Sequence, residues 1–210
     1  STPKPSSAAS DVYKRQQQGM LRTKTPKIRG ADMALYKTTA MIGYFISAIV
    51  GLLWLTVFWL PFAIILYPLT ILLRGFGWAS ISKEFNKKVF FVISIVILLG
   101  GVLLYTIGLN ILPLPGVSQD FDPPKLKLLA GIWIVYSLAE FVSYLLMRKH
   151  SKIFIGALAS IIGIGIVASF LPTTIADARD FIPFVWSAVP FLILSAICAA
   201  IGFAKLKPPE

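Results

Sequence analysis

The stretch that decides the fold reads MIGYFISAIVGLLWLTVFWLPFAIILYPLTILL, residues 41–73, and it contains no charged side chain. As one straight helix it would be about 50 Å long at about 1.5 Å per residue, whereas the hydrocarbon core of a bilayer is about 30 Å thick. The chain must therefore bend within it. Pro61 and Pro68 are the expected places, because proline lacks an amide hydrogen and clashes with the preceding helical turn.

Two arrangements of residues 41–73 satisfy this length. The one that we predict is a single span over residues 41–60, followed by a kinked or interfacial segment. The other is a tight hairpin of two short crossings. The hairpin would place three aromatic side chains at the membrane interface, where tryptophan is enriched: Trp54, Phe58 and Trp59.

The composition of the whole chain also points to lipid as its solvent. Apolar residues make up 57% of the sequence and charged residues 14%, and the mean hydropathy is +0.80. An ordinary soluble domain is close to half apolar and a quarter charged. The apolar residues gather in runs of about twenty, the length that a helix needs to cross a bilayer.

We therefore predict an all-α fold, a polytopic bundle of transmembrane helices in a single domain over residues 33–210. Helices fit this environment because they satisfy their own backbone hydrogen bonds in lipid. The bundle would have about five spans, or six if residues 41–73 form a hairpin. Besides that first stretch, the predicted spans cover residues 89–112, 128–147, 153–171 and 184–204.

Lys and Arg in the loops divide unequally between the two sides of the predicted membrane, nine against three. The richer side is expected to face the cytoplasm. We predict the cytoplasmic (inner) membrane of a prokaryote, with the C-terminus cytoplasmic. The N-terminus would lie outside with five spans and inside with six. The nine are Arg74, Lys83, Lys87, Lys88, Arg148, Lys149, Lys152, Lys205 and Lys207, and the three are Lys125, Lys127 and Arg179.

Residues 1–32 are expected to contribute nothing to this fold. Residues 6–16 read SSAASDVYKRQ, which is the translation of a widely used adapter of transposon-based sequencing libraries, so we expect residues 1–16 to be adapter rather than protein and the chain to come from an environmental read. Residues 17–32 are basic and are interpreted as either a disordered segment or an untranslated leader. In the second case translation begins at Met33.

Glu140 is the candidate functional residue, because it lies near the middle of the third predicted span, where an ionised side chain costs about 2.5 to 3.5 kcal/mol on insertion scales. With no basic residue expected in another span, we predict a largely protonated carboxyl group that faces protein or water. The residues expected to hold it lie at helical spacing on its own span or on the second span. They are Tyr136, Ser137, Tyr144 and Asn110, with Trp133, Ser143, Tyr105 and Thr106 beside them.

Small residues recur every three or four positions in the fourth span, and we interpret this face as a helix-packing surface: Gly156, Ser160 and Gly163. The chain has one cysteine and one histidine, Cys198 and His150. It therefore cannot form an internal disulfide or a metal site built from several Cys or His ligands. We expect no metal and no cofactor.

Two functional classes follow from these features. The one we predict is a non-catalytic structural or auxiliary membrane component that acts through helix packing, with lipid, copies of itself or other membrane proteins as partners and no nucleic acid. No spacing of Ser, His and acid, or of paired carboxylates, indicates an enzyme. The alternative is a small proton- or cation-coupled transporter or channel-like protein that uses Glu140.

Overall fold

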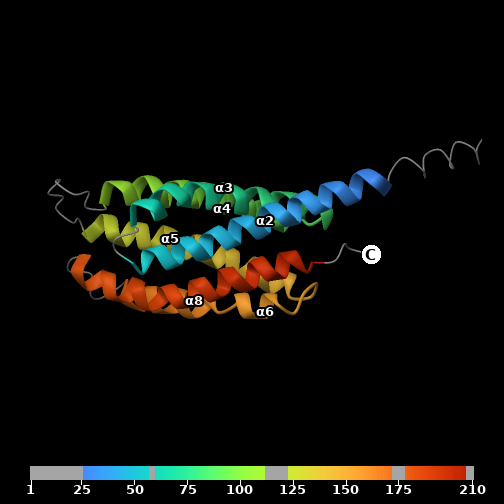
Figure 1. Ribbon diagram of the computed structural model, residues 1–210. Helices are drawn as coiled ribbons and strands as arrows, with labels where there is room; N and C mark the ends of the chain where they lie inside the picture. Colours follow the sequence, from blue (N-terminus) through green and yellow to red (C-terminus); the bar gives the residue numbers. More distant parts are fainter. Residues whose placement is uncertain (1–25, 57–59, 112–122, 172–177, 207–210) are drawn as a thin grey trace, which may run out of the picture. The chain divides into compact units, whose positions relative to one another are not determined.

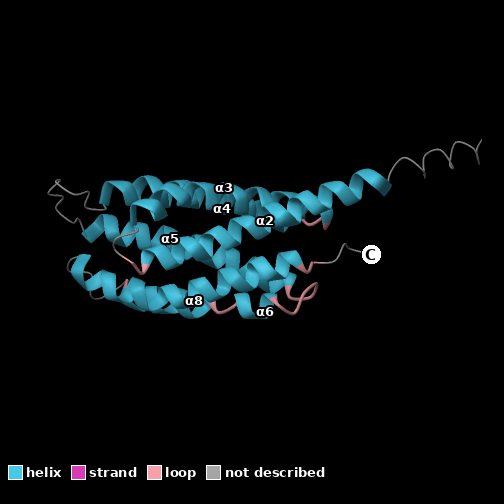
Figure 2. Cartoon of the chain, in the orientation of Figure 1, coloured by secondary structure: helices cyan, strands magenta, loops and turns pink. Residues whose placement is uncertain are grey.

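The computed structural model describes residues 26–56, 60–111, 123–171 and 178–206, and the regular secondary structure of these residues is entirely helical (Figures 1 and 2). The predicted all-α fold is thus confirmed. The chain divides into two units at Tyr36, and the helices from Tyr36 onward belong to the second unit. The helices are α2 (Pro26–Trp54), α3 (Leu60–Glu84), α4 (Lys88–Ile111), α5 (Pro123–Met147), α6 (Phe154–Ala157), α7 (Ser160–Phe170) and α8 (Ala178–Ala204).

Among the described residues, five helices are long and apolar enough to cross a membrane, which gives the chain the character of a membrane protein. Large apolar side chains also point outward, as lipid requires: Ile65 is 71% exposed and Val135 62%. The five candidate spans are Leu35–Trp54, Pro61–Glu84, Lys88–Asn110, Pro123–Met147 and Val185–Ala204.

The stretch 41–73 forms parts of two helices, not one kinked helix, and this agrees with the hairpin alternative in shape, although α3 continues to Glu84; the number of membrane crossings stays a prediction. The helix α2 ends at Trp54, where Leu55 and Thr56 donate backbone hydrogen bonds three residues back. Pro61 lies in the first turn of α3, where an amide hydrogen would have no intrahelical partner, and Pro68 is accommodated inside that helix. Proline here starts a helix rather than bending one.

The predicted fourth span, residues 153–171, is divided between the short helices α6 and α7. From Phe154 to Ile162 several backbone amides donate to the carbonyl three residues back, which is 3₁₀ geometry. Such a stretch rises about 2.0 Å per residue rather than about 1.5 Å. At the smaller rise the 19 residues 153–171 would cover about 29 Å, and the 3₁₀ bonds lengthen this, so the segment still has about the length of a bilayer crossing.

Successive helices pack against one another within residues 36–210. In the described part of this unit, α3 packs on α4, α4 on α5, and α5 on α6 and α7, which in turn pack on α8. Small residues let α2 and α3 approach closely and run antiparallel. A Cβ atom on Gly43 would come within 2.8 Å of Leu73 Cβ, and one on Gly77 within 2.6 Å of Ala40 Cβ.

The up-and-down helix order brings one set of basic residues to one end of this unit, which we call the basic end. It contains the part of α2 next to Tyr36, where this unit starts, the α3–α4 and α5–α6 connections, and the end of α8; the two connections and the end of α8 lie together in Figure 1. Arg74, which we had counted with these residues, instead lies inside α3. The basic side chains of the basic end within the described ranges are Lys37, Lys83, Lys87, Lys88, Arg148, Lys149, Lys152 and Lys205.

The predictions for the N-terminal segment are only partly covered by the structure. Residues 1–16 and 17–25 lie outside the described residues, so the adapter assignment stays a prediction. Residues 26–32, which we assigned to a disordered or untranslated leader, are helical and belong to the first turns of α2.

Candidate functional site

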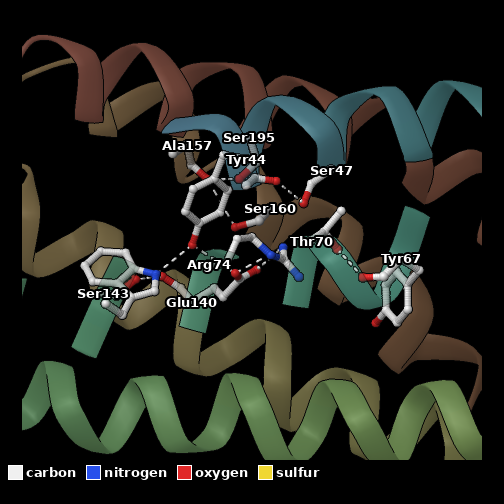
Figure 3. A network of polar contacts seen from close by, with 12 residues as sticks. Tyr44, Ser47, Tyr67, Thr70, Arg74, Glu140, Ser143, Ala157, Ser160 and Ser195 are labelled. Atoms are coloured by element: carbon white, nitrogen blue, oxygen red, sulfur yellow. Dashed lines mark hydrogen bonds and ion pairs between the residues drawn. The ribbon is translucent and has the colours of Figure 1, made fainter. Parts of the chain in front are cut away.

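Glu140 lies inside the bundle, where side chains from two other helices converge on its carboxylate. Tyr44 reaches it from α2 and Arg74 from α3, and Figure 3 shows both side chains directed at Glu140. Only 8% of Glu140 and 7% of Arg74 is exposed. The carboxylate therefore ties three helices together.

The contacts of the carboxylate are an ion pair and two hydrogen bonds. Arg74 Nη1 lies 3.1 Å from Glu140 Oε1 and donates to Oε2 at 3.3 Å. The hydroxyl of Tyr44 donates to Oε1 at 2.9 Å. Each of these partners supplies a hydrogen atom, and charge-assisted bonds of this kind are the stronger ones. The arrangement therefore suits an ionised carboxylate rather than the protonated group that we predicted.

The indole of Trp78 fixes the direction of this network. Trp78 Nε1 lies 2.7 Å from the hydroxyl oxygen of Tyr44, and an indole nitrogen can only donate. The Tyr44 oxygen therefore accepts from Trp78, and its own hydrogen is donated to Glu140. Two hydrogen bonds in series thus join Trp78 of α3, Tyr44 of α2 and Glu140 of α5.

Arg74 is held between two aromatic rings as well as by the carboxylate. Its Cζ atom lies 5.4 Å from the ring centre of Tyr44 and 5.2 Å from that of Tyr136. At these distances a guanidinium is attracted to the ring face, an effect worth about 2 kcal/mol when desolvated. Two buried polar atoms beside the pair, Arg74 Nε and the Tyr136 hydroxyl oxygen, have no hydrogen-bond partner among the described residues.

Helical periodicity explains why these side chains meet. Residues four apart lie on one face of a helix, so α5 presents Tyr136, Glu140 and Tyr144 on one face, and all three are buried. Arg74 and Trp78 share a face of α3 in the same way. The absence of a side chain at Gly43 completes the site, because a Cβ atom there would lie 3.1 Å from Arg74 Cγ.

An aromatic cluster separates the ion pair from the basic end. The rings of Tyr44 and Phe203 stack with centres 5.4 Å apart, and Trp78 meets Phe203 edge-on at 5.1 Å. Tyr144 stacks on Phe154 at 6.2 Å. The side chains of Trp78, Tyr44 and Phe203 are fully buried, so this cluster shields the pair from water at that end.

The predicted companions of Glu140 are only partly brought to it. Tyr136, Ser137 and Tyr144 are buried on the same helix, as predicted. The hydroxyl of Ser143 donates to the backbone carbonyl of Glu140, not to its carboxylate. The prediction that Arg74 lies in a loop was wrong, because α3 continues past it to Glu84.

The second span does not supply Asn110 to the carboxylate. Gly100 of α4 lies against the ring of Tyr136, and α4 and α5 run antiparallel, so the antiparallel order places Asn110 about 20 Å along the axis from Glu140. The side-chain amide of Asn110 donates to the backbone carbonyl of Thr106. The hydroxyl of Thr106 donates to the carbonyl of Val102 in the same helix. Tyr105 stacks instead with Tyr67, at 6.4 Å.

The predicted packing face of the fourth span meets α8. A Cβ atom on Gly156 would lie 2.5 Å from Cys198 Sγ, and one on Gly163 would lie 3.2 Å from the carbonyl oxygen of Ala188. Where the backbone changes from α6 to α7, the carbonyl of Ala157 accepts from two hydroxyls, those of Ser195 at 2.6 Å and Ser160 at 3.1 Å (Figure 3). The small residues therefore permit close approach, and Ser195 ties the irregular backbone to α8.

His150 is an exposed titratable group at the basic end. Its ring meets that of Phe85 edge-on, with centres 4.6 Å apart. Partial burial lowers the pKa of His150 from its ordinary value, and the positive charges of Lys87 and Lys149 lower this pKa further.

No protein-family model, curated protein or solved structure matches this chain. Within the part of the chain that the structure describes, no three or more His, Cys, Asp or Glu side chains gather where they could hold a metal ion. Among the described residues, the Glu140 site is therefore the feature from which a function can be inferred.

Proposed function

We propose that this chain is an integral membrane protein with a non-catalytic structural or auxiliary role, acting through helix packing. Glu140 then serves as a fixed tie between α2, α3 and α5. The observation that carries the proposal is the ion pair of Arg74 with Glu140, with 3.1 Å between Nη1 and Oε1. The permanent positive charge of Arg74 favours the ionised form of the carboxyl group and so opposes its uptake of a proton.

Two further features support a static role. The hydrogen bonds from Trp78 to Tyr44 and from Tyr44 to Glu140 hold the carboxyl group in place from two further helices. The surrounding aromatic rings and the close glycine contacts of α2 with α3 make the site closely packed. A buried pair of this kind fixes which helices meet and in which register.

The second candidate is the small proton- or cation-coupled transporter or channel-like protein. The observation in its favour is that the buried Arg74 Nε and Tyr136 hydroxyl oxygen have no partner among the described residues. Such atoms beside an ion pair could bind water on a proton path.

Proton flux in proteoliposomes separates the two functions. Native protein and the Glu140→Gln variant are compared under an imposed pH gradient, with Glu84→Gln as the matched control, because Glu84 lies at the basic end, at the end of α3. We expect equal flux in all three, at the level of empty liposomes. A flux that Glu140→Gln abolishes and Glu84→Gln preserves would establish the transporter instead.

We further propose that the basic end faces the cytoplasm in the inner membrane of a prokaryote. Eight basic side chains against one acidic side chain, Glu84, support this orientation among the described residues of that end. With six crossings, the chain near Tyr36 and near Leu206 would then be cytoplasmic. Reporter fusions at both positions should be active only when their reporter works in the cytoplasm, and a periplasmic signal near Tyr36 would contradict the six crossings.

A further inference from the structure

An open apolar groove of about 370 Å³ lies between α2 and α8, near the basic end. This volume is within the range of small-molecule sites, about 300 to 1,000 Å³. Only apolar atoms line it, and one wall includes Phe45, which is 59% exposed. The lining residues are Met41, Ile42, Phe45, Ala200, Ile201 and Ala204.

Two lysines stand at the same end of this groove. Lys37 precedes Met41 by four residues on α2, and Lys205 follows Ile201 by four residues on α8. Residues four apart share a helix face. The residues of α2 near Tyr36 and the end of α8 both lie at the basic end, so each lysine lies one turn beyond its wall of the groove, on the side where polar headgroups would meet the bilayer.

We propose that the groove binds an acyl chain of an anionic phospholipid whose phosphate lies between Lys37 and Lys205. Apolar walls with two positive charges at one end complement an anionic headgroup joined to a hydrocarbon chain. This inference goes beyond the structural role proposed above and does not depend on Glu140.

A second copy of the chain fits the groove less well. In a two-fold dimer with its axis along the membrane normal, each copy presents the same surface to the other. Lys37 and Lys205 of both copies would then gather at one end of the interface, and like charges at close range repel. An anionic lipid removes this repulsion rather than adding to it.

Lipid retention by the full chain in detergent, measured by native mass spectrometry, tests the proposal. The probes are phosphatidylglycerol and phosphatidylcholine with identical acyl chains. We expect the native protein to retain phosphatidylglycerol preferentially. The double variant Lys37→Gln/Lys205→Gln should bind it roughly 25-fold more weakly, since each lysine near a membrane surface contributes about 1 kcal/mol and about 1.4 kcal/mol is tenfold.

A matched charge control is Lys149→Gln/Lys152→Gln, which removes two positive charges from the same end but away from the groove. It should retain phosphatidylglycerol as the native protein does. Equal loss in both double variants would mean a diffuse charge effect and would overturn the site, as would equal retention of the two lipids by native protein. Lys149, Lys152 and Lys205 are exposed and Lys37 is half-buried, so the unfolding transition of each double variant is measured beside its lipid retention, and we expect both to stay folded.

A groove-filling variant tests the apolar part of the site. Ala204 is exposed on the groove wall, so Ala204→Phe should reduce phosphatidylglycerol retention several-fold. Val135→Phe, on the exposed face of α5, should not. If Ala204→Phe instead leaves lipid retention unchanged and converts a dimer to a monomer, the occupant is a second copy and the proposal is wrong.

Discussion

Replacing Glu140 and replacing Arg74 should destabilise the bundle to different extents, although each change breaks the same ion pair. Glu140→Gln leaves the guanidinium buried without a counter-charge, and arginine cannot lose its proton in a protein. Arg74→Gln leaves a carboxylate instead, and a carboxyl group can neutralise itself by binding a proton. Glu140→Gln should therefore lower the free energy of unfolding more than Arg74→Gln does.

The expected magnitudes follow from the contacts. Removing one partner of a buried pair typically costs about 3 to 5 kcal/mol. The rings of Tyr44 and Tyr136 still face Arg74 in Glu140→Gln, so we expect about 3 kcal/mol, the lower end of that range. For Arg74→Gln we expect about 1 to 2 kcal/mol, the cost of a buried group that has lost one charged partner.

The assay is reversible unfolding in mixed micelles by titration with a denaturing detergent, applied to native protein, both single variants and the double variant. Two amides can hydrogen-bond to each other, so the double variant should be more stable than the sum of the single effects by about 2 kcal/mol. A coupling energy below about 0.5 kcal/mol, which is the scatter of independent sites, would refute the tie between the helices. A greater loss in Arg74→Gln than in Glu140→Gln would refute the ionised carboxylate.

Three other predictions use matched variants and the same unfolding assay. Gly77→Ala should destabilise by about 1 to 3 kcal/mol because its Cβ meets backbone at Ala40, whereas Gly165→Ala, with no heavy atom within 4 Å of its Cβ, should be neutral or slightly stabilising; equal effects would contradict the close α2–α3 contact. Ser195→Ala should cost about 1 kcal/mol through its lost hydrogen bond to the Ala157 carbonyl, and the exposed Ser169→Ala almost nothing. Because the pKa of His150 is lower in the folded chain than its ordinary 6.5, the unfolded chain binds the proton more readily, so stability should fall as the pH drops through 6.5 towards the folded pKa. His150→Gln should remove this slope, and an unchanged slope would assign it to other groups.

The sequence predicted the helical membrane fold because apolar runs of spanning length leave few alternatives. It misplaced the break in residues 41–73 because proline was interpreted as a bend, although Pro61 suits the first turn of a helix. The break is set by the end of α2 at Trp54, and no single residue there signals it as strongly as proline does. Tertiary packing decides such boundaries.

The candidate site was predicted in part for a similar reason. Glu140 stood out because a carboxylate in an apolar helix is costly, and its own face, with Tyr136 and Tyr144, follows from helical spacing alone. Arg74 was missed because a charge that ends an apolar run normally marks a membrane surface, and GFGWASIS after it is less apolar than a typical span. Two signals could have revealed it: an unpaired buried carboxylate needs a cation, and residues 75–82 contain no charge.

Asn110 was wrongly predicted as a partner of Glu140 because the two residues lie at different heights along the antiparallel helices α4 and α5. In adjacent antiparallel helices, residues equally far from the shared connection lie level with one another. Glu140 lies in the half of α5 that is far from the α4–α5 connection, so it is level with the first half of α4. Asn110 lies at the other end of that helix. The order of the helices was known from the sequence, and counting from the α4–α5 connection would have excluded this contact.

The ion pair of Arg74 with Glu140 is tested most directly by the protonation state of Glu140 in a lipid bilayer. This state is measured as the infrared difference spectrum between native protein and Glu140→Gln, both with isotope-labelled glutamate. A carboxylate held by Arg74 and Tyr44 predicts an ionised band that stays unchanged from mildly acidic to mildly basic pH. A protonated carboxyl band, or one that appears and disappears across that range, would contradict the fixed ion pair on which the proposed structural role depends.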